Sequence, residues 1–244
     1  MSARLAVFAS GGGSNLQAFL DRFADAAHVC VALVASDRAD AGALVRAASA
    51  GVEAVHIPVS GRATHDIARD TLDALAVHDI DFIALAGYLR LVPQQVVAAY
   101  RGRILNIHPA LLPAFGGPGM YGRRVHEAVL AAGCRVTGAT VHYVDERYDE
   151  GRIIAQWPVP VMPGDDPATL AARVLRIEHR MYPAVVAALA RGSVDEGAVA
   201  GDVAAVSPGS GGRAGEVGAV AGETFQLRDD SWPSDRHIIA IARV

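Results

Sequence analysis

Short apolar runs alternate with longer stretches of helical periodicity from Leu5 to Ala190, and this order most constrains the fold. Alternating strands and helices are typical of a doubly wound α/β fold, in which a mostly parallel sheet carries helices on both faces. The apolar runs predict strands at Leu5–Ala9, Val29–Ala35, Ala54–Ile57, Phe82–Ala86, Ile104–Ile107, Thr140–Val144 and Ile153–Val159. The periodic stretches predict helices at Asn15–Ala26, Ala41–Ala50, Thr64–Val77, Pro93–Ala99, Arg123–Ala132 and Pro167–Ala190.

The regular pattern ends near Gly192. The full chain has 52% hydrophobic residues, and the segment 1–192 is long enough to bury a complete core as one domain. Residues 193–222 are rich in Gly, Ala, Val, Ser and acidic residues without periodicity, which predicts a linker or disordered segment. Residues 223–244 form a tail in which His237–Val244 is a candidate edge strand.

Composition excludes several classes of function. The formal net charge of -4 argues against nucleic acid as a partner, because phosphate binding needs clustered basic charge. The chain contains no Lys, so it has no phosphate-binding Walker loop. No apolar run is long enough to span a membrane and no signal peptide pattern opens the chain, which predicts a soluble, cytoplasmic protein. Cys30 and Cys134 lack metal-type spacing and are expected to be reduced core residues.

A glycine-rich turn, Ser10-Gly11-Gly12-Gly13-Ser14-Asn15, follows the first predicted strand and opens a helix. Glycines let the backbone approach a ligand, and the free N–H groups of a helix start attract anions such as phosphate. A structural alternative is a tight turn in which Ser14 caps the helix. A dinucleotide fingerprint would require a third glycine where Leu16 stands, although Asp37 after the second strand keeps a nicotinamide cofactor open.

The stretch Asn106-Ile107-His108-Pro109 is the most informative candidate site. Strand alternation puts Asn106 and His108 on one face, and Pro109 ends the strand directly after them. Both side chains therefore lie at the carboxyl end of a strand, where open parallel sheets bind ligands.

Asp149 lies in a turn, Tyr148-Asp149-Glu150-Gly151, where an acid is commonly just solvated. It becomes functional if the loop folds back towards His108, since a carboxylate favours a protonated imidazole. His142 alternates along a strand and is interpreted as structural. His108, His142 and Asp149 do not match a standard metal-ligand spacing, and no metal is expected.

Taken together these residues resemble the phosphoribosylglycinamide formyltransferase family over residues 4–192. The shared stretches are FASGGGSNLQAFLD (8–21), LAGYLRLV (85–92), LNIHPALLPAF (105–115), VHEAVLAAG (125–133), TGATVHYVDERYDEGRIIAQ (137–156) and RIEHRMYP (176–183). The resemblance implies a Rossmann-like formyltransferase fold. It also implies an enzyme of purine synthesis that transfers the formyl group of 10-formyltetrahydrofolate, its cosubstrate, to glycinamide ribonucleotide.

The resemblance also implies roles for individual residues. Asn106, His108 and Asp149 match the family's catalytic trio, in which a cationic His108 held by Asp149 would act with Asn106 as donor to an oxyanion. The nucleotide would contact the residues Gly13, Ser14, Asn15 and Glu178. The folate would contact the residues Leu89, Arg90, Val92 and Asn106, with the loop 145–149 closing around it.

Two segments depart from the family pattern. Residues 114–125 are longer than in shorter members, although Gly119, Met120 and Gly122 suggest a loop near the nucleotide. The tail after Gly192 matches poorly and leaves a monomer and a homodimer open.

Four alternatives remain beside this interpretation. Methionyl-tRNA formyltransferase would need a basic domain that the acidic tail does not supply. Formyltetrahydrofolate deformylase normally carries an extra N-terminal domain, whereas here the first strand begins near residue 4. A catalytically inactive folate- or nucleotide-binding module would have no use for the complete trio, and a nicotinamide oxidoreductase lacks the third glycine.

Overall fold

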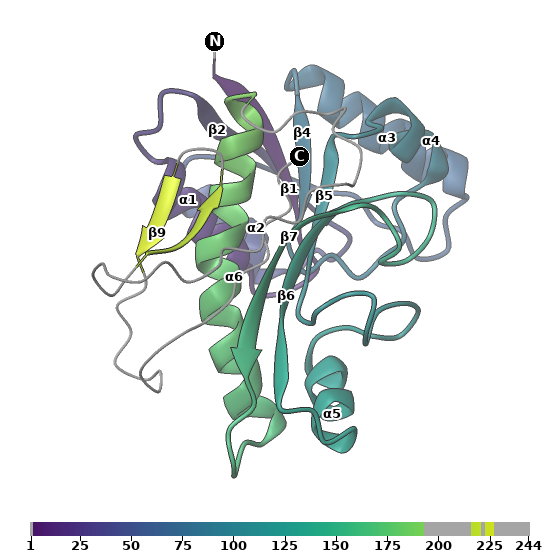
Figure 1. Cartoon of the computed structure of the whole chain (residues 1–244). Helices are drawn as coiled ribbons and strands as arrows, with labels where there is room; N and C mark the ends of the chain where they lie inside the picture. Colours follow the sequence, from purple (N-terminus) through teal and green to yellow (C-terminus); the bar gives the residue numbers. More distant parts are fainter. Residues whose placement is uncertain (1, 193–215, 221–222, 227–244) are drawn as a thin grey trace.

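A computed structural model describes residues 2–192, 216–220 and 223–226. Seven strands form one sheet in the order β3-β2-β1-β4-β5-β6-β7 (Figure 1). The strands are β1 (Ala3–Phe8), β2 (Val29–Ser36), β3 (Glu53–His56), β4 (Phe82–Leu85), β5 (Ile104–His108), β6 (Val136–Tyr143) and β7 (Ile153–Pro160). The helices are α1 (Ser14–Phe23), α2 (Gly42–Ser49), α3 (Thr64–Val77), α4 (Gln94–Ala99), α5 (Arg123–Ala131) and α6 (Pro167–Ala190). This arrangement confirms the doubly wound α/β prediction.

Alternation along the buried strands divides the core into two layers. In β1, Leu5 and Val7 pack with α1, α2, α5 and α6, whereas Ala6 and Phe8 pack with α3 and α4. Figure 1 shows α6 on one side of the central strands and α3 with α4 on the other. Because both faces are covered, the central strands read as continuous apolar runs.

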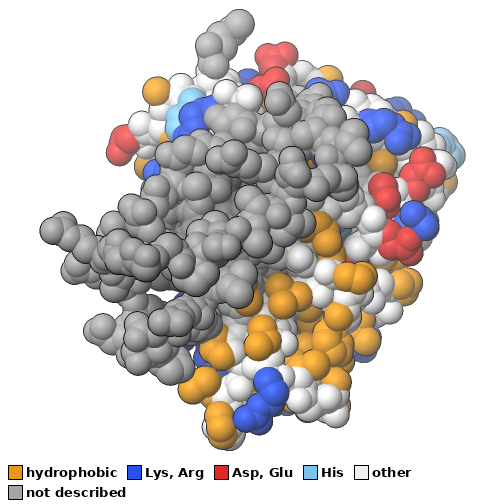
Figure 2. Space-filling view, in the orientation of Figure 1, with side chains coloured by type: hydrophobic (Ala, Val, Ile, Leu, Met, Phe, Trp, Pro, Cys, Tyr) orange, Lys and Arg blue, Asp and Glu red, His pale blue; other side chains and the backbone are white. Residues whose placement is uncertain are grey.

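The strands β1 to β5 are parallel, and β6 and β7 add to the sheet in antiparallel orientation. The edge strand β7 contains Pro158 and Pro160, whose missing N–H groups block further pairing at this edge. In the view of Figure 2, hydrophobic side chains gather over the lower part of the molecule, where Figure 1 draws β6 and β7, and charged side chains gather near α3 and α4.

The sheet order creates a crevice between β1 and β4. From β1 the chain winds outward through β2 and β3, then returns to β4 on the other side of β1. The connections that leave the carboxyl ends of β1 and β4 therefore separate, which is where ligands bind in open α/β sheets.

The C-terminal region contains two further strands. The strands β8 (Glu216–Val220) and β9 (Glu223–Gln226) form a separate antiparallel pair. Strand β8 falls inside the stretch expected to be a linker, and β9 inside the expected tail. The candidate edge strand His237–Val244 lies outside the described residues. Cys30 and Cys134 are free, as expected, but only partly buried.

Candidate active site

The crevice contains a cavity of about 620 Å³. Its walls are the connection Gly87–Val92 after β4, the carboxyl end of β5 from Asn106 to Pro109, the loop 144–149 and parts of α5 and α6. This volume lies in the range of sites that bind small molecules and cofactors.

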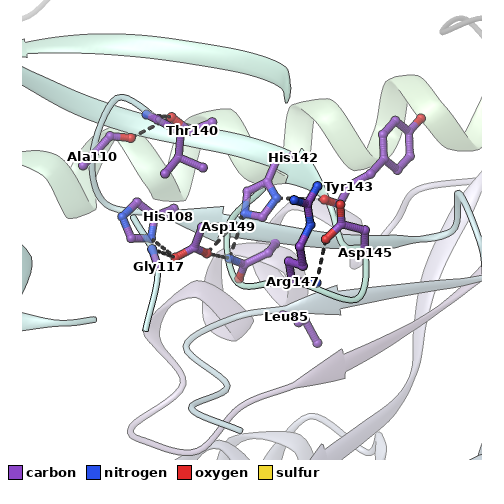
Figure 3. A network of polar contacts seen from close by, with 12 residues as sticks. Leu85, His108, Ala110, Gly117, Thr140, His142, Tyr143, Asp145, Arg147 and Asp149 are labelled. Atoms are coloured by element: carbon purple, nitrogen blue, oxygen red, sulfur yellow. Dashed lines mark hydrogen bonds and ion pairs between the residues drawn. The ribbon is translucent and has the colours of Figure 1, made fainter. Parts of the chain in front are cut away.

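The loop after β6 brings Asp149 back to the end of β5 (Figure 3). Oδ2 of Asp149 lies 3.5 Å from Nδ1 of His108, and Oδ1 lies 3.4 Å from the Asn106 amide nitrogen. Asp149 has a positive φ of 55°, and the Gly117 N–H donates to its Oδ2 over 2.9 Å. The structure therefore brings Asp149 to Asn106 and His108, which the sequence placed on a different segment.

His142 belongs to the same polar network. In the register between β5 and β6 it pairs with Asn106. Its Nδ1 donates to the Tyr143 carbonyl over 2.8 Å, which leaves Nε2 to accept from the Asn106 amide over 3.0 Å. Strand alternation indicated the face of His142, but interpreting it as a purely structural residue missed that it orients Asn106.

The environment of His108 disfavours the expected cation. Its Nε2 lies 2.8 Å from the Phe115 carbonyl and is therefore a donor. Burial is the largest influence and lowers the pKa of His108, although Asp149 acts in the opposite direction. Desolvation thus acts against the expected protonation of His108, whereas the carboxylate of Asp149 and the Phe115 carbonyl act in its favour.

Asp149 remains ionised. Burial is the largest single influence on its pKa and acts to raise it, but contacts with His142, His108 and the Gly117 N–H together lower it. A carboxylate therefore faces the unprotonated Nδ1 of His108, and a proton that arrives between them is shared by both groups.

The glycine turn is built around backbone conformation rather than side-chain capping. Gly13 is the N-cap of α1 with a φ of 74°, and no side chain caps this helix, so Ser14 is not the cap. A Cβ on Gly13 would also lie 2.8 Å from Cα of Ala43. The N–H groups at the start of α1 precede the first bond of the helix, from Gln17 to Gly13, and are available to an anion. Leu16 is buried in the core.

Asn15 and Glu178 extend this turn into the cavity, although Gly13 and Ser14 do not line it. The Asn15 amide donates to Oε2 of Glu178 over 2.7 Å, which joins α1 to α6. Burial raises the pKa of Glu178, with the Asn15 bond opposing it. Two of the four residues predicted to bind nucleotide thus form one buried polar pair.

Three of the four residues predicted to bind folate lie along the opposite loop, and the fourth, Asn106, lies on β5. Leu89, Arg90 and Val92 line the cavity. Ser10, at the end of β1, holds this loop, since its N–H donates to the Gly87 carbonyl over 3.0 Å and its Oγ accepts from the Leu89 N–H over 2.9 Å. The loop therefore offers a fixed row of backbone groups to a ligand.

Several lining residues were not predicted or were only suggested by the sequence. Gly119, Met120 and Gly122 lie in the cavity wall, as suggested for the long 114–125 segment. His126 of α5 also lines the cavity, and its Nδ1 is buried without a hydrogen-bond partner among the described residues. Asp37 is absent from the cavity wall, which removes the feature that kept a nicotinamide cofactor open.

Two negative findings apply to the described part of the chain. No helix there is both long and apolar enough to cross a membrane. Residues 2–192 with the two short C-terminal strands contain no group of three or more His, Cys, Asp or Glu side chains arranged to hold a metal ion.

The burial of His126 predicts a pH dependence of stability. Burial, followed by the nearby His108, lowers the pKa of His126 from its ordinary 6.5. As pH falls, His126 therefore takes up a proton in the unfolded chain at a higher pH than in the folded protein. The stability contributed by the neutral ring is lost as pH falls below 6.5. Between pH 7 and about pH 5, we expect His126→Gln to lose less unfolding free energy than the wild type, as measured by urea unfolding. Parallel losses in both proteins would contradict this assignment.

Comparison with known proteins places residues 3–186 among formyltransferases. A family model described as formyl transferase matches residues 3–186. The chain is 46% identical over 189 residues to the chloroplastic phosphoribosylglycinamide formyltransferase of Arabidopsis thaliana, covering 76% of this chain and 65% of the relative. It is 45% identical over 194 residues to phosphoribosylglycinamide formyltransferase of Mycobacterium tuberculosis, covering 77% and 85%.

Solved structures agree with this comparison. The crystal structure of phosphoribosylglycinamide formyltransferase from Brucella melitensis has 41% sequence identity and a TM-score of 0.72, covering 82% of this chain and 98% of that one. The match covers only 65% and 60% of the two plant relatives, from Arabidopsis thaliana and Vigna unguiculata. The chain therefore spans less than two thirds of these plant proteins.

Proposed function

The chain belongs to the formyl transferase family, and from this premise we propose that it transfers the formyl group of 10-formyltetrahydrofolate to the amine of glycinamide ribonucleotide, a step of purine synthesis. The observation that carries the proposal is the meeting of Asn106, His108 and Asp149 in the wall of one cavity. The names and identities of the relatives from Arabidopsis thaliana and Mycobacterium tuberculosis support the choice of substrates.

The cavity fits both substrates chemically. The start of α1 offers N–H groups for the phosphate of the nucleotide, and the buried Asn15–Glu178 pair offers polar groups for its sugar. The loop Gly87–Val92 offers backbone donors and acceptors for a pterin. Leu89 and Leu91 are half exposed there and supply apolar contact for a flat ring.

Asn106 and His108 supply the donors for the reaction. The Asn106 amide donates to the formyl oxygen, which becomes negatively charged when the amine nitrogen bonds to the formyl carbon, and His108 joins it as a donor once Nδ1 carries a proton; one such donor lowers a barrier by about 3 kcal/mol. In the resting network both hydrogens of the Asn106 amide point to acceptors, and the bond to Asp149 at 3.4 Å is the longer one. The hydrogen on that side is the one that turns most readily to the substrate.

Asp149 handles the proton of the attacking amine. The carboxylate accepts it, directly or through a water, as the new carbon–nitrogen bond forms. The proton then passes to the tetrahydrofolate nitrogen as the bond from that nitrogen to the formyl carbon breaks. Burial favours the neutral ring of His108 before the reaction. The amine proton, taken up between Asp149 and Nδ1 of His108, makes the ring cationic while negative charge develops on the formyl oxygen, and the ring is neutral again once that proton reaches the tetrahydrofolate nitrogen.

The proposal is tested by following tetrahydrofolate release from 10-formyltetrahydrofolate with and without glycinamide ribonucleotide. Release that depends on the nucleotide supports the transferase. Equal release without nucleotide would make water the acceptor and favour a deformylase. Folate binding without release would leave a binding module and contradict the proposal.

We extend the proposal to the organisation of the chain. Residues 1–192 form the catalytic domain, and the protein acts in the cytoplasm as a monomer or homodimer on small molecules alone. The net charge of -4 supports the absence of a nucleic-acid partner. No metal takes part in the chemistry described, since Asn106, His108 and Asp149 supply its donors and its base.

The variant Glu178→Gln is expected to have a more stable fold but weaker binding of the nucleotide. The amide keeps an acceptor for Asn15 but loses the charge whose burial raises the pKa of Glu178. Because ionised Glu178 is penalised in the folded state, the variant should have a higher Tm at pH 8. Its KM for glycinamide ribonucleotide should rise about tenfold through the loss of one charged contact to the sugar.

Calorimetry and steady-state kinetics check the two parts of this prediction. The KM for 10-formyltetrahydrofolate serves as the internal control and should change little. A variant with a lower Tm, or with an unchanged KM for the nucleotide, would contradict the role assigned to Glu178.

A further inference from the structure

Asp37 carries a buried carboxylate beside the cavity but outside its wall. It directly follows Ser36, the last residue of β2, and its side chain is only 2% exposed. Carboxylates are rarely buried unless they are paired, because desolvation of the charge is unfavourable. The burial of Asp37 therefore needs a partner that compensates it.

The partner is Arg90 in the loop predicted to bind folate. Nε of Arg90 donates to Oδ2 of Asp37 over 2.8 Å, and the Arg90 side chain is 53% exposed and lines the cavity. The ion pair links the loop that follows β2 to the loop that follows β4. It passes over the end of β1, the strand between β2 and β4.

The geometry of this pair is not the one that best satisfies a buried carboxylate. In the pair formed by Arg173 and Asp165, two guanidinium nitrogens reach both carboxylate oxygens. Asp37 instead uses one oxygen, and its Oδ1 is buried without a hydrogen-bond partner within residues 2–192. A bidentate pair is the stronger arrangement, so the Asp37 contact is better explained by where it holds Arg90 than by the stability it adds.

The ion pair lies between two other anchors of the loop. Before Arg90, the loop is held by Ser10 at Gly87 and Leu89 and by Tyr88, whose ring contacts that of Phe8 at 5.5 Å. After it, Val92 is buried in the core.

Between these anchors Leu89 and Leu91 are 50% and 51% exposed and pack little against the protein. The contact with Asp37 holds the part of the loop that burial does not hold.

We infer that Asp37 is a positioning residue that sets the conformation of residues 89–91 through Arg90 and thereby the affinity of the site for folate. The inference rests on the proposed function, because the loop matters only if it receives this substrate. Asp37 does not touch the cavity, so its effect must pass through Arg90.

The test uses Asp37→Asn and Asp37→Ala in the full chain. Loss of the charged partner should raise the KM for 10-formyltetrahydrofolate about tenfold in the alanine variant and less in the asparagine variant, which keeps an acceptor. The dissociation constant of tetrahydrofolate, measured by titration calorimetry, should rise by the same factor. The kcat and the KM for glycinamide ribonucleotide should stay within about twofold, since the trio and the Asn15–Glu178 pair are untouched.

Asp40→Asn is the matched control. Asp40 lies in the same connection and pairs with Arg38 at 2.9 Å, but both side chains are exposed and neither lines the cavity. It should leave both KM values unchanged. A fall in kcat with a rise of both KM values in the Asp37 variants would indicate general structural damage and overturn the inference.

Two outcomes separate the inference from the function on which it rests. Wild-type protein that binds tetrahydrofolate, together with Asp37 variants that bind it equally well, would overturn the inference alone. Wild-type protein that neither binds tetrahydrofolate nor turns over would defeat the proposed function and the inference with it.

Discussion

The kcat of an Asp149→Asn variant is expected to fall by a factor of roughly 10² to 10⁴, the usual contribution of a positioned acid or base. The amide keeps the shape of the carboxylate and an acceptor for the Gly117 N–H. It loses the charge that faces Nδ1 of His108 at 3.5 Å and the capacity to accept a proton. In the proposed mechanism the step that moves the amine proton therefore slows, whereas the proposed nucleotide contacts on α1 and α6 remain.

Steady-state kinetics with both substrates check this prediction. The KM for glycinamide ribonucleotide should change by less than about threefold, because the substitution does not alter contacts made equally in the bound ground state and in the transition state. Glu150→Gln is the control, since the neighbouring carboxylate is exposed, pairs with Arg147 and does not line the cavity. An Asp149→Asn enzyme in which KM rises and kcat is retained would remove Asp149 from the chemistry.

The sequence predicts the elements of the fold well because their signals are local. Each strand predicted before Gly192 overlaps an observed strand, since strands buried on both faces read as short apolar runs. The antiparallel direction of β6 and β7 has no such signal. For the β6–β7 pair it follows from the short loop 144–152, which joins two neighbouring strands and leaves no room for a crossover helix. The β5–β6 pair is joined through α5, and its antiparallel pairing has no such local cause.

Parts of the site were predictable for the same reason. Alternation put Asn106 and His108 on one face, and the Pro after them marked the end of the strand. The role of His142 depends instead on strand order, because it faces Asn106 only if β6 lies beside β5. Strand order is a property of the whole sheet, and the spacing of two residues along the chain does not contain it.

The electrostatic features of the site were the least predictable from the sequence. The sequence indicates that a carboxylate and an imidazole can meet, but the pKa of His108 depends on how much water the fold removes from it. The Asp37–Arg90 pair joins residues 53 positions apart through the ends of three strands, and no local pattern marks it. Both the pKa of His108 and the Asp37–Arg90 contact depend on burial by residues that are distant in the sequence.

A Gly151→Ala variant is expected to show the largest loss of stability. Gly151 lies between the Asp149 loop and β7, where a Cβ would overlap the backbone carbonyl of Tyr143. Neither atom belongs to a flexible side chain, so the strand end must shift to relieve the overlap. Overpacking of this kind destabilises a fold by about 3 kcal/mol, which lowers Tm by roughly 6–12 °C for a domain of this size.

The same shift should also reach the active site, because Gly151 is two residues from Asp149. Scanning calorimetry at pH 7.5 with Gly12→Ala as the control isolates the steric cause, since a Cβ on Gly12 meets no atom within 4 Å. We expect the control to keep its Tm, and the Gly151→Ala variant to lose turnover even at temperatures where it is folded. A variant with the wild-type Tm would contradict this prediction. It would show that the strand end can move at little energetic cost, and that the loop holds Asp149 without close packing against Tyr143.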